Sequence, residues 1–207
     1  KKVVLVGLDI RKPRLAELFE IDDHRHGITN LLTKNVVTAA DIQGQMLPSG
    51  VNENLELLMA GPIPPNPAEL LTRTSLDDII GQLKHTYDYV IIDTAPVGLV
   101  TDTLQVGRVS NLTIYVCRAD YTPKENFELI NTLHAENKLP NICVVVNGID
   151  LSKKKYGYYY GYGKYGRYAK YGYYGRYGKY GRYNNYGNYG NYSNSHYSNE
   201  NDTSVKQ

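Results

Sequence analysis

The stretch "VVLVGLDIRKP", residues 3–13, places an aspartate and an arginine directly behind a short apolar run. The run at residues 3–7 is continuous rather than alternating, which is typical of a strand whose two faces are both covered in a parallel sheet. Four more runs of this kind follow, at residues 55–59, 89–93, 112–117 and 142–147. Five buried strands are therefore predicted.

Helical patterns separate these strands. Residues 13–19 open with a proline, as helix starts often do. Residues 67–87 carry apolar side chains at three- and four-residue spacing, with a break expected near Thr74, and residues 122–137 follow a Thr-Pro start. Alternation of strands and helices predicts an α/β fold with a mostly parallel sheet and helices on both faces.

The composition changes sharply near residue 150, which divides the chain into a globular part, 1–150, and a tail, 151–207. Of the 21 tyrosines, 17 follow Lys155. A period of three runs through Tyr162, Tyr165, Tyr168, Tyr171, Tyr174, Tyr177, Tyr180, Tyr183, Tyr186, Tyr189 and Tyr192. This period fits neither helix nor strand, and the interspersed glycines make ordering costly, so a disordered tail is predicted.

Charge is unevenly distributed although the whole chain carries only +2. From Tyr156 onward there are seven Lys or Arg and two acids, so the tail is basic. Cys117 and Cys143 lie in apolar runs and are predicted to be buried free thiols. No apolar run approaches the roughly 18 residues of a membrane span, and no signal peptide is evident. A chain that starts inside a strand, without methionine, suggests the C-terminal piece of a longer protein.

Polar groups end three of the predicted strands: Asp9, Asp93 and Asn147. Ligands of such sheets collect beyond the carboxyl ends of the strands. An aspartate placed there is costly without a partner, and in nucleotide-binding proteins that partner is often Mg²⁺ bridging phosphate oxygens. For Asp93 the alternative is a helix cap or a buried hydrogen bond.

These residues resemble motifs of the bacterial tyrosine kinases of capsule and exopolysaccharide biosynthesis, which are deviant P-loop ATPases related to MinD and ParA. "VVLVGLDIRKP" resembles their Walker A′ motif, and "YVIIDTAPVGLVTD" (residues 89–102) resembles Walker B. "AGPIPPNPAELL" (residues 60–71) is similar to a further family signature, and the tyrosine-rich tail is the fourth match. The resemblance implies a P-loop NTPase-like fold.

The resemblance also implies roles for single residues. Asp93 would hold Mg²⁺ through water, Asp9 would share the metal site and polarise or deprotonate the attacking tyrosine, and Arg11 would face phosphate or a neighbouring acid. Asn147 would read the adenine edge of ATP. Asp102 is a candidate for the surroundings of the nucleotide or a helix cap, and Arg118 is either near the nucleotide or a surface residue.

Two departures from the family pattern stand out. Gly7 occupies the first position of the family's D-x-D pair, so the role of the base rests on Asp9. The phosphate-binding loop G-x-x-x-x-G-K-[ST] is absent from the printed sequence, and the family places it before the first strand. We therefore expect it upstream, and expect the isolated chain to bind ATP poorly and to fold poorly without a central strand.

The function that the resemblance implies is ATP-dependent tyrosine autophosphorylation. The tail of one subunit in a homo-oligomeric ring would be modified by its neighbour, and the added charge would drive the ring apart. An upstream membrane-spanning polysaccharide co-polymerase portion would hold the kinase at the cytoplasmic face of the bacterial inner membrane. A cognate tyrosine phosphatase would reset it.

Two other functions remain open: a partitioning-type ATPase of the MinD/ParA kind, and a nucleic-acid-binding or self-associating tail that stacks bases on tyrosine. The Asn-rich end of the tail offers phosphates no cations, so no nucleic-acid partner is expected. His24 and His26 are interpreted as a solvated loop rather than a metal site. Residues 62–67, "PIPPNP", are interpreted as a rigid helix entry, and residues 47–50, "LPSG", as a connection.

Overall fold

A four-stranded sheet in the order β2-β3-β1-β4 forms the centre of the computed structural model, which describes residues 1–150. Its strands are β1 (Val3–Gly7), β2 (Leu47–Pro48), β3 (Leu55–Leu58) and β4 (Tyr89–Asp93). β1 is central and runs parallel to both β3 and β4, whereas β2 is antiparallel to β3. The interpretation of "LPSG" as a connection is wrong for its first two residues, which form β2. A strand of two residues is too short to show a periodic pattern in the sequence.

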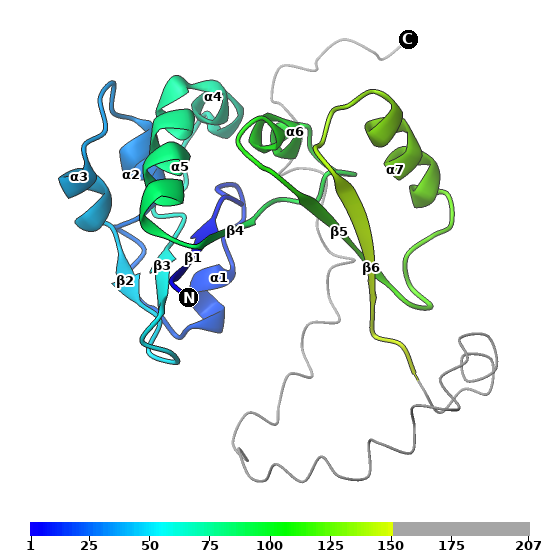
Figure 1. Cartoon of the computed structure of the whole chain (residues 1–207), viewed down its shortest axis with the longest axis horizontal. Helices are drawn as coiled ribbons and strands as arrows, with labels where there is room; N and C mark the ends of the chain where they lie inside the picture. The colour runs from blue at the N-terminus through cyan, green and yellow to red at the C-terminus, as the bar shows by residue number, and fades with distance from the viewer. Residues whose placement is uncertain (151–207) are drawn as a thin grey trace, which may run out of the picture.

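Seven helices are described, and they are short except for α5 and α7 (Figure 1). They are α1 (Leu15–Leu18), α2 (Ile28–Leu32), α3 (Ala39–Gln43), α4 (Pro67–Thr72), α5 (Thr74–Thr86), α6 (Asp102–Gly107) and α7 (Asn126–Ala135). The expected break in the long helical segment is confirmed, because Arg73 has an extended ψ of 149° between α4 and α5. The sequence did not predict α2, α3 and α6, which are too short to show a periodic apolar face.

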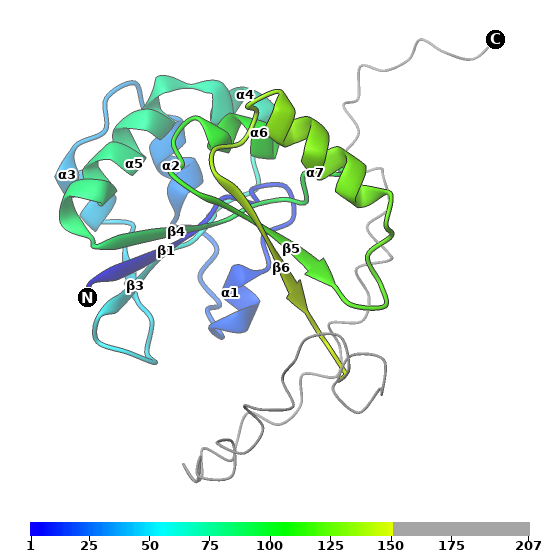
Figure 2. The same cartoon turned by 45° about the vertical axis from the view of Figure 1, so that its right-hand side comes forward.

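Helices cover both faces of the four-stranded sheet, as predicted (Figure 2). Val4 and Val6 of β1 are fully buried in one core cluster together with residues of α2, α4 and α5. The alternate residue Leu5 packs in a second cluster with Leu57 and Ala16, which belongs to α1. Successive side chains of a strand point to opposite faces, so β1 contributes to two cores at once.

The last two strands, β5 (Thr113–Arg118) and β6 (Ile142–Asn147), pair with each other in a separate parallel sheet. The sequence predicted one sheet covered on both faces, and within residues 1–150 this is not what forms. Tyr89 and Ile91 of β4 are 58 and 53 % exposed, and Ile114 and Val116 of β5 are 56 and 62 % exposed. Tyr89 and Ile91, like Ile114 and Val116, are alternate residues of a strand and so share one face of it, and that face is left open at these side chains.

Cys117 is buried and Cys143 is exposed, so the prediction of two buried thiols is correct for Cys117 and wrong for Cys143. Cys143 lies on β6, whose side chains are mostly exposed although the run is apolar. An apolar run shows that a strand can be covered, and tertiary packing decides whether it is. No helix within residues 1–150 has the length and apolar character needed to cross a membrane.

Candidate active site

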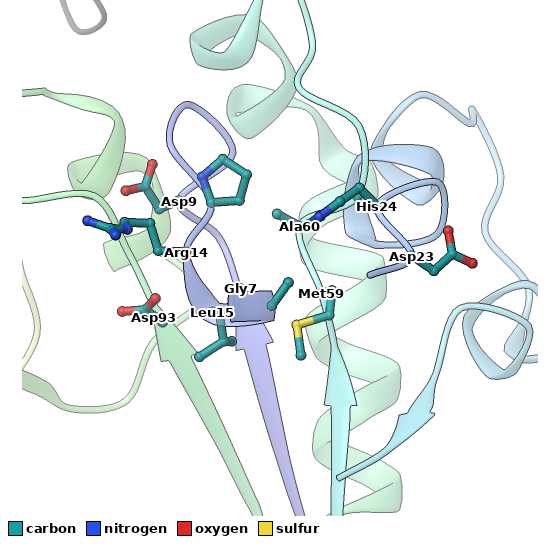
Figure 3. Close-up of a pocket in the computed structure, with 12 residues that line it drawn as sticks. Gly7, Asp9, Arg14, Leu15, Asp23, His24, Met59, Ala60 and Asp93 are labelled. Atoms are coloured by element: carbon teal, nitrogen blue, oxygen red, sulfur yellow. The ribbon is translucent and has the colours of Figure 1, made fainter. Parts of the chain in front are cut away.

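The carboxyl ends of β1, β3 and β4 open onto one pocket (Figure 3). The pairing of Gly7 with Asp93 places the ends of β1 and β4 side by side, and the Leu8 amide continues the ladder by donating to the Asp93 carbonyl at 2.7 Å. The lining comprises Gly7, Asp9, Pro13, Arg14, Leu15, Ala16, Asp23, His24, Met59, Ala60, Gly61 and Asp93. The structure thus brings Asp9 and Asp93 together, where the topology of a parallel sheet places a ligand.

Asp9 is held by its own loop. The residue is 9 % exposed, and its Oδ1 accepts hydrogen bonds from the backbone amides of Arg11 at 3.3 Å and Lys12 at 3.0 Å. Backbone donors fix the orientation of a carboxylate because they cannot rotate away. Asp9 therefore occupies a defined position at the end of β1.

Asp93 faces a like charge. Burial within the pocket wall, together with the negative charge of Asp9, raises the pKa of its carboxyl above the ordinary value. Part of this effect is screened, because Asp93 remains exposed to solvent. A pair of neighbouring carboxylates fits a hard divalent cation that prefers oxygen ligands, and Mg²⁺ commonly takes one or two carboxylates and completes its shell with water and phosphate. The residues present therefore fit Mg²⁺.

Arg11 is paired with a neighbouring acid. Its Nε donates to Asp102 Oδ2 at 2.5 Å and its Nη2 to Asp102 Oδ1 at 3.2 Å, in a bidentate ion pair. Both side chains are buried, at 9 and 6 % exposure. Asp102 is the first residue of α6, and both of its carboxylate oxygens accept hydrogen bonds from Arg11. Sequence reasoning named both residues and did not join them.

Arg118 and Asn147 end the second sheet, where they are register partners. The Arg118 guanidinium lies 5.4 Å from the centroid of the Tyr121 ring, and Asn147 Oδ1 accepts a hydrogen bond from the Gly148 amide at 2.8 Å. Both residues are exposed and neither lines the pocket with Asp9. The two nucleotide-binding candidates are thus close to each other and separate from the paired carboxylates.

Sequence reasoning missed the pocket residues Arg14, Asp23 and Met59, and it interpreted His24, which also lines the pocket, as part of a solvated loop. Hydrogen bonds from Arg25 and His26 lower the pKa of Asp23 well below its usual range, with the Arg25 amide as the largest cause. The carboxylate of Asp23 therefore stays charged at physiological pH. No local pattern marked Asp23 and His24, because the loop before α2 reaches the pocket only through packing against the chain that follows β3.

The histidines at 24 and 26 do not build a metal site within the described residues. His26 Nδ1 lies 2.8 Å from Asp23 Oδ2 and His24 lines the pocket wall. Across residues 1–150, no three or more His, Cys, Asp or Glu side chains are grouped so as to hold a metal alone. The predicted tail and its eleven acceptor tyrosines lie outside the described residues.

A mostly parallel α/β sheet with acids at adjacent strand ends is the arrangement of the P-loop NTPase-like fold. MinD in the MinC–MinD complex of Aquifex aeolicus shares this fold, with a TM-score of 0.57 at 20 % identity over 76 % of this chain and 60 % of that one. The kinase domain of the Escherichia coli tyrosine kinase ETK gives a TM-score of 0.63 at 26 % identity, covering 72 % of this chain and 56 % of that domain.

Similar proteins with curated names point to one group within this class. Tyrosine-protein kinase YwqD of Bacillus subtilis is 33 % identical over 160 residues, covering 77 % of this chain and 65 % of the relative. Tyrosine-protein kinase CpsD of Streptococcus pneumoniae is 29 % identical over 162 residues, covering 78 % of this chain and 69 % of the relative. No family model matches the sequence. The chain is a homologue of the bacterial tyrosine-protein kinases, and it spans about two-thirds of the length of these relatives.

Proposed function

We propose that this chain carries the Walker A′ and Walker B part of an ATP-dependent protein-tyrosine autokinase. The observation that supports this most directly is the placement of Asp9 and Asp93 at adjacent strand ends over one pocket. The homologous kinases give the chemistry a precedent. Residues 1–150 would form the catalytic part, and residues 151–207 would carry the substrate tyrosines.

Asp9 would act on the acceptor tyrosine. A tyrosine hydroxyl has a pKa of about 10 and is a weak nucleophile until a base approaches. Asp9 would polarise or accept the phenolic proton while the phenolate oxygen forms a bond to the γ-phosphorus of ATP. The bond from that phosphorus to the bridging oxygen would break, with ADP as leaving group.

Asp93 would hold Mg²⁺ with Asp9 close by. When bound, the cation would supply positive charge that orients the phosphate oxygens of ATP and offsets the negative charge that develops on them. It would also offset the repulsion between the two carboxylates, which adds to the larger effect of desolvation in raising the pKa of Asp93. The apolar wall formed by Leu15 and Met59 would exclude water from the acceptor ring.

Nucleotide binding would need more than these carboxylates. Asn147 and Arg118, exposed at the end of the second sheet, are the residues we propose for the adenine side. The phosphates need a loop that supplies backbone amides and a lysine, and the printed sequence lacks the motif of such a loop. The open edge of β4, with Tyr89 and Ile91 exposed, is suited to a further parallel strand that would bring such a loop to the pocket.

The tail would serve as both substrate and charge switch. Residues 1–150 hold 13 Lys or Arg against 19 Asp or Glu, a net charge of −6, while the tail is basic. This complementarity favours docking of an unmodified tail on a neighbouring subunit. Each phosphate adds about −1.5 to −2 charges, so ten would shift the tail by roughly −15 to −20 and replace attraction with repulsion.

The assembly and its setting are carried over from the relatives. Wzc of Salmonella typhimurium, 30 % identical over 162 residues, is matched over 22 % of its length. A chimerical CapA2B2 protein is a structural neighbour with a TM-score of 0.60 at 29 % identity, covering 72 % of this chain and 63 % of that one. We accordingly propose a homo-oligomeric ring at the cytoplasmic face of the inner membrane, joined to a membrane-spanning polysaccharide co-polymerase and reset by a tyrosine phosphatase.

The test is mass spectrometry of the full-length protein after incubation with ATP and Mg²⁺. Phosphate on the period-three tyrosines is the expected result, and Asp93→Asn should abolish it. Asp78→Asn, a substitution of an exposed acid on α5, is the matched control and should leave labelling unchanged. Consumption of ATP with no modified tyrosine would refute the autokinase and favour the alternative below.

A partitioning-type ATPase is the second candidate, because MinD and ParA proteins share the fold. Such an enzyme would hydrolyse ATP with water as the acceptor and would leave the tail unmodified. Removing residues 156–207 from the full-length protein separates the two functions. The kinase would lose its phosphate incorporation, whereas the ATPase would keep its turnover.

A further inference from the structure

The Arg11–Asp102 ion pair is far more buried than comparable pairs in residues 1–150. Its two side chains are 9 and 6 % exposed, whereas those of Arg108 and Asp77 are 30 and 47 % exposed. Taking two charges out of water costs about as much as their attraction returns, so a buried pair is a weak source of stability. We therefore ask what the ion pair does for the arrangement of the site rather than for the stability of the fold.

The pair connects two loops of the candidate active site. Arg11 belongs to the loop after β1, and Asp102 begins α6 at the end of the loop after β4. A bidentate contact between a planar guanidinium and a carboxylate fixes direction as well as distance. The loop after β1, which carries Asp9, is thereby tied to the end of the loop after β4.

Asp9 receives its orientation from the residue that Asp102 holds. The backbone amide of Arg11 and that of Lys12 both donate to Asp9 Oδ1. A shift of the Arg11 backbone would therefore move both donors and with them the carboxylate. Asp9 and Asp93 also repel each other, so the loop that carries Asp9 needs a restraint that acts in the absence of a metal ion.

We propose that Arg11 and Asp102 are positioning residues that fix the Asp9 carboxylate beside Asp93 before nucleotide and metal bind. This role rests on the proposed kinase function and extends it to two residues that touch neither substrate nor metal. The pair connects the loop that carries Asp9 to the start of α6. Its loss misplaces Asp9 while the fold remains.

The competing role for Arg11 is a direct contact with phosphate. The two roles predict different effects of the substitution Asp102→Asn on nucleotide affinity. Two guanidinium nitrogens of Arg11 are bound by Asp102. Asp102→Asn would weaken that hold and make Arg11 more available to phosphate, so a phosphate-binding Arg11 would tighten nucleotide affinity. A positioning role instead predicts slower phosphate transfer with no gain in nucleotide affinity.

The experiment compares Asp102→Asn with Asp77→Asn in the full-length protein. Asp77 pairs with Arg108, the residue that follows α6, so the control also removes an Arg–Asp bond near α6 but away from the pocket. Hydrogen exchange in the absence of nucleotide measures how well the backbone amides of Arg11 and Lys12 are protected. Asp102→Asn should speed their exchange about tenfold and lower kcat by about 10- to 100-fold with KM for ATP little changed. Asp77→Asn should alter neither.

A second variant separates position from stability. Arg11→Met/Asp102→Leu removes both charges and keeps most of the volume, so its melting temperature should equal or exceed that of the wild type. Its kcat should stay low. Wild-type kcat in this double variant, or unchanged amide exchange in Asp102→Asn, would overturn the positioning role. A wild-type protein that transfers no phosphate would instead refute the kinase function, while the exchange result would still decide the geometry.

Discussion

Gly27 lies directly against Gly61, so the loop before α2 rests on the chain as it leaves β3. A Cβ added to Gly27 would come within 2.3 Å of the Gly61 nitrogen and 2.4 Å of the Met59 carbonyl oxygen. The Gly27 amide is held as well, donating to Gln45 Oε1 at 2.7 Å. This contact brings Asp23 and His24 to the pocket wall, where His24 points toward Ala60 and the Asp23 carboxylate points away from Asp9 and Asp93 (Figure 3).

Gly27→Ala is expected to destabilise the full-length protein by about 1–3 kcal/mol, since the neighbours of the new methyl group are backbone atoms that must shift. Gly81→Ala is the matched control. Gly81 lies within α5 with nothing within 4 Å of an added Cβ, so there alanine should stabilise by up to about 1 kcal/mol through helix propensity. Urea unfolding measures both variants. Equal effects of the same sign would contradict the close approach of Gly27 and Gly61.

Asp93→Asn is expected to raise the melting temperature of the metal-free protein at pH 7. The pKa of Asp93 is raised in the fold, so the folded state binds its proton more tightly than the unfolded state and stability falls as the pH rises through that range. Below about pH 4, where an ordinary aspartate takes up its proton, the difference from asparagine should shrink. Melting temperatures from pH 3 to 8 give the measurement. Asp78→Asn, on the exposed side of α5, should show no such trend.

Tyr87→Phe is expected to cost about 1–3 kcal/mol. The Tyr87 hydroxyl donates to Glu56 Oε2 at 2.6 Å, and Tyr87 is only 8 % exposed, so the substitution removes a hydrogen bond to a charged group. Tyr89→Phe, two residues further on, tests the same chemistry at a side chain that is 58 % exposed and should be near neutral. Chemical denaturation compares the two. A larger loss for Tyr89→Phe would show that the Tyr87–Glu56 bond contributes little.

The order of phosphorylation should follow the charge of the tail. Six of its period-three tyrosines directly follow a lysine or arginine, namely Tyr165, Tyr168, Tyr171, Tyr177, Tyr180 and Tyr183. The net charge of −6 on residues 1–150 favours these acceptors over Tyr186, Tyr189 and Tyr192, which follow asparagine. Time-resolved phosphopeptide analysis should find the first group modified earlier, and about 0.5 M salt should erase the difference by screening.

Arg167→Asn supplies the control for this order. It converts the residue before Tyr168 into the type found before Tyr189 and leaves the tyrosine period intact. The rate at Tyr168 should fall toward that at Tyr189, while the rate at Tyr165 is unchanged. Early modification of the Asn-flanked tyrosines, or an order that is insensitive to salt, would contradict charge-guided docking.

The sequence by itself determined the elements whose physics is local. The apolar runs at Val3–Gly7 and Tyr89–Asp93 form strands because β-branched and aliphatic side chains suit a covered sheet. Asp9 and Asp93 could be predicted as site residues because ligands collect at the carboxyl ends of such strands. A break near Thr74 was also predicted, and the structure has it one residue earlier, at Arg73. The resemblance to the bacterial tyrosine kinases came from these same short motifs.

The tertiary structure alone decided which distant residues meet. Arg11 and Asp102 are 91 positions apart, and their bond exists because parallel pairing of β1 with β4 brings the loops after both strands together. Gly27 and Gly61 likewise touch only after β3 is in place. The exposure of Cys143 and Ile91 has the same origin: an apolar side chain favours burial, but the partner that would cover it is set by packing over the whole chain.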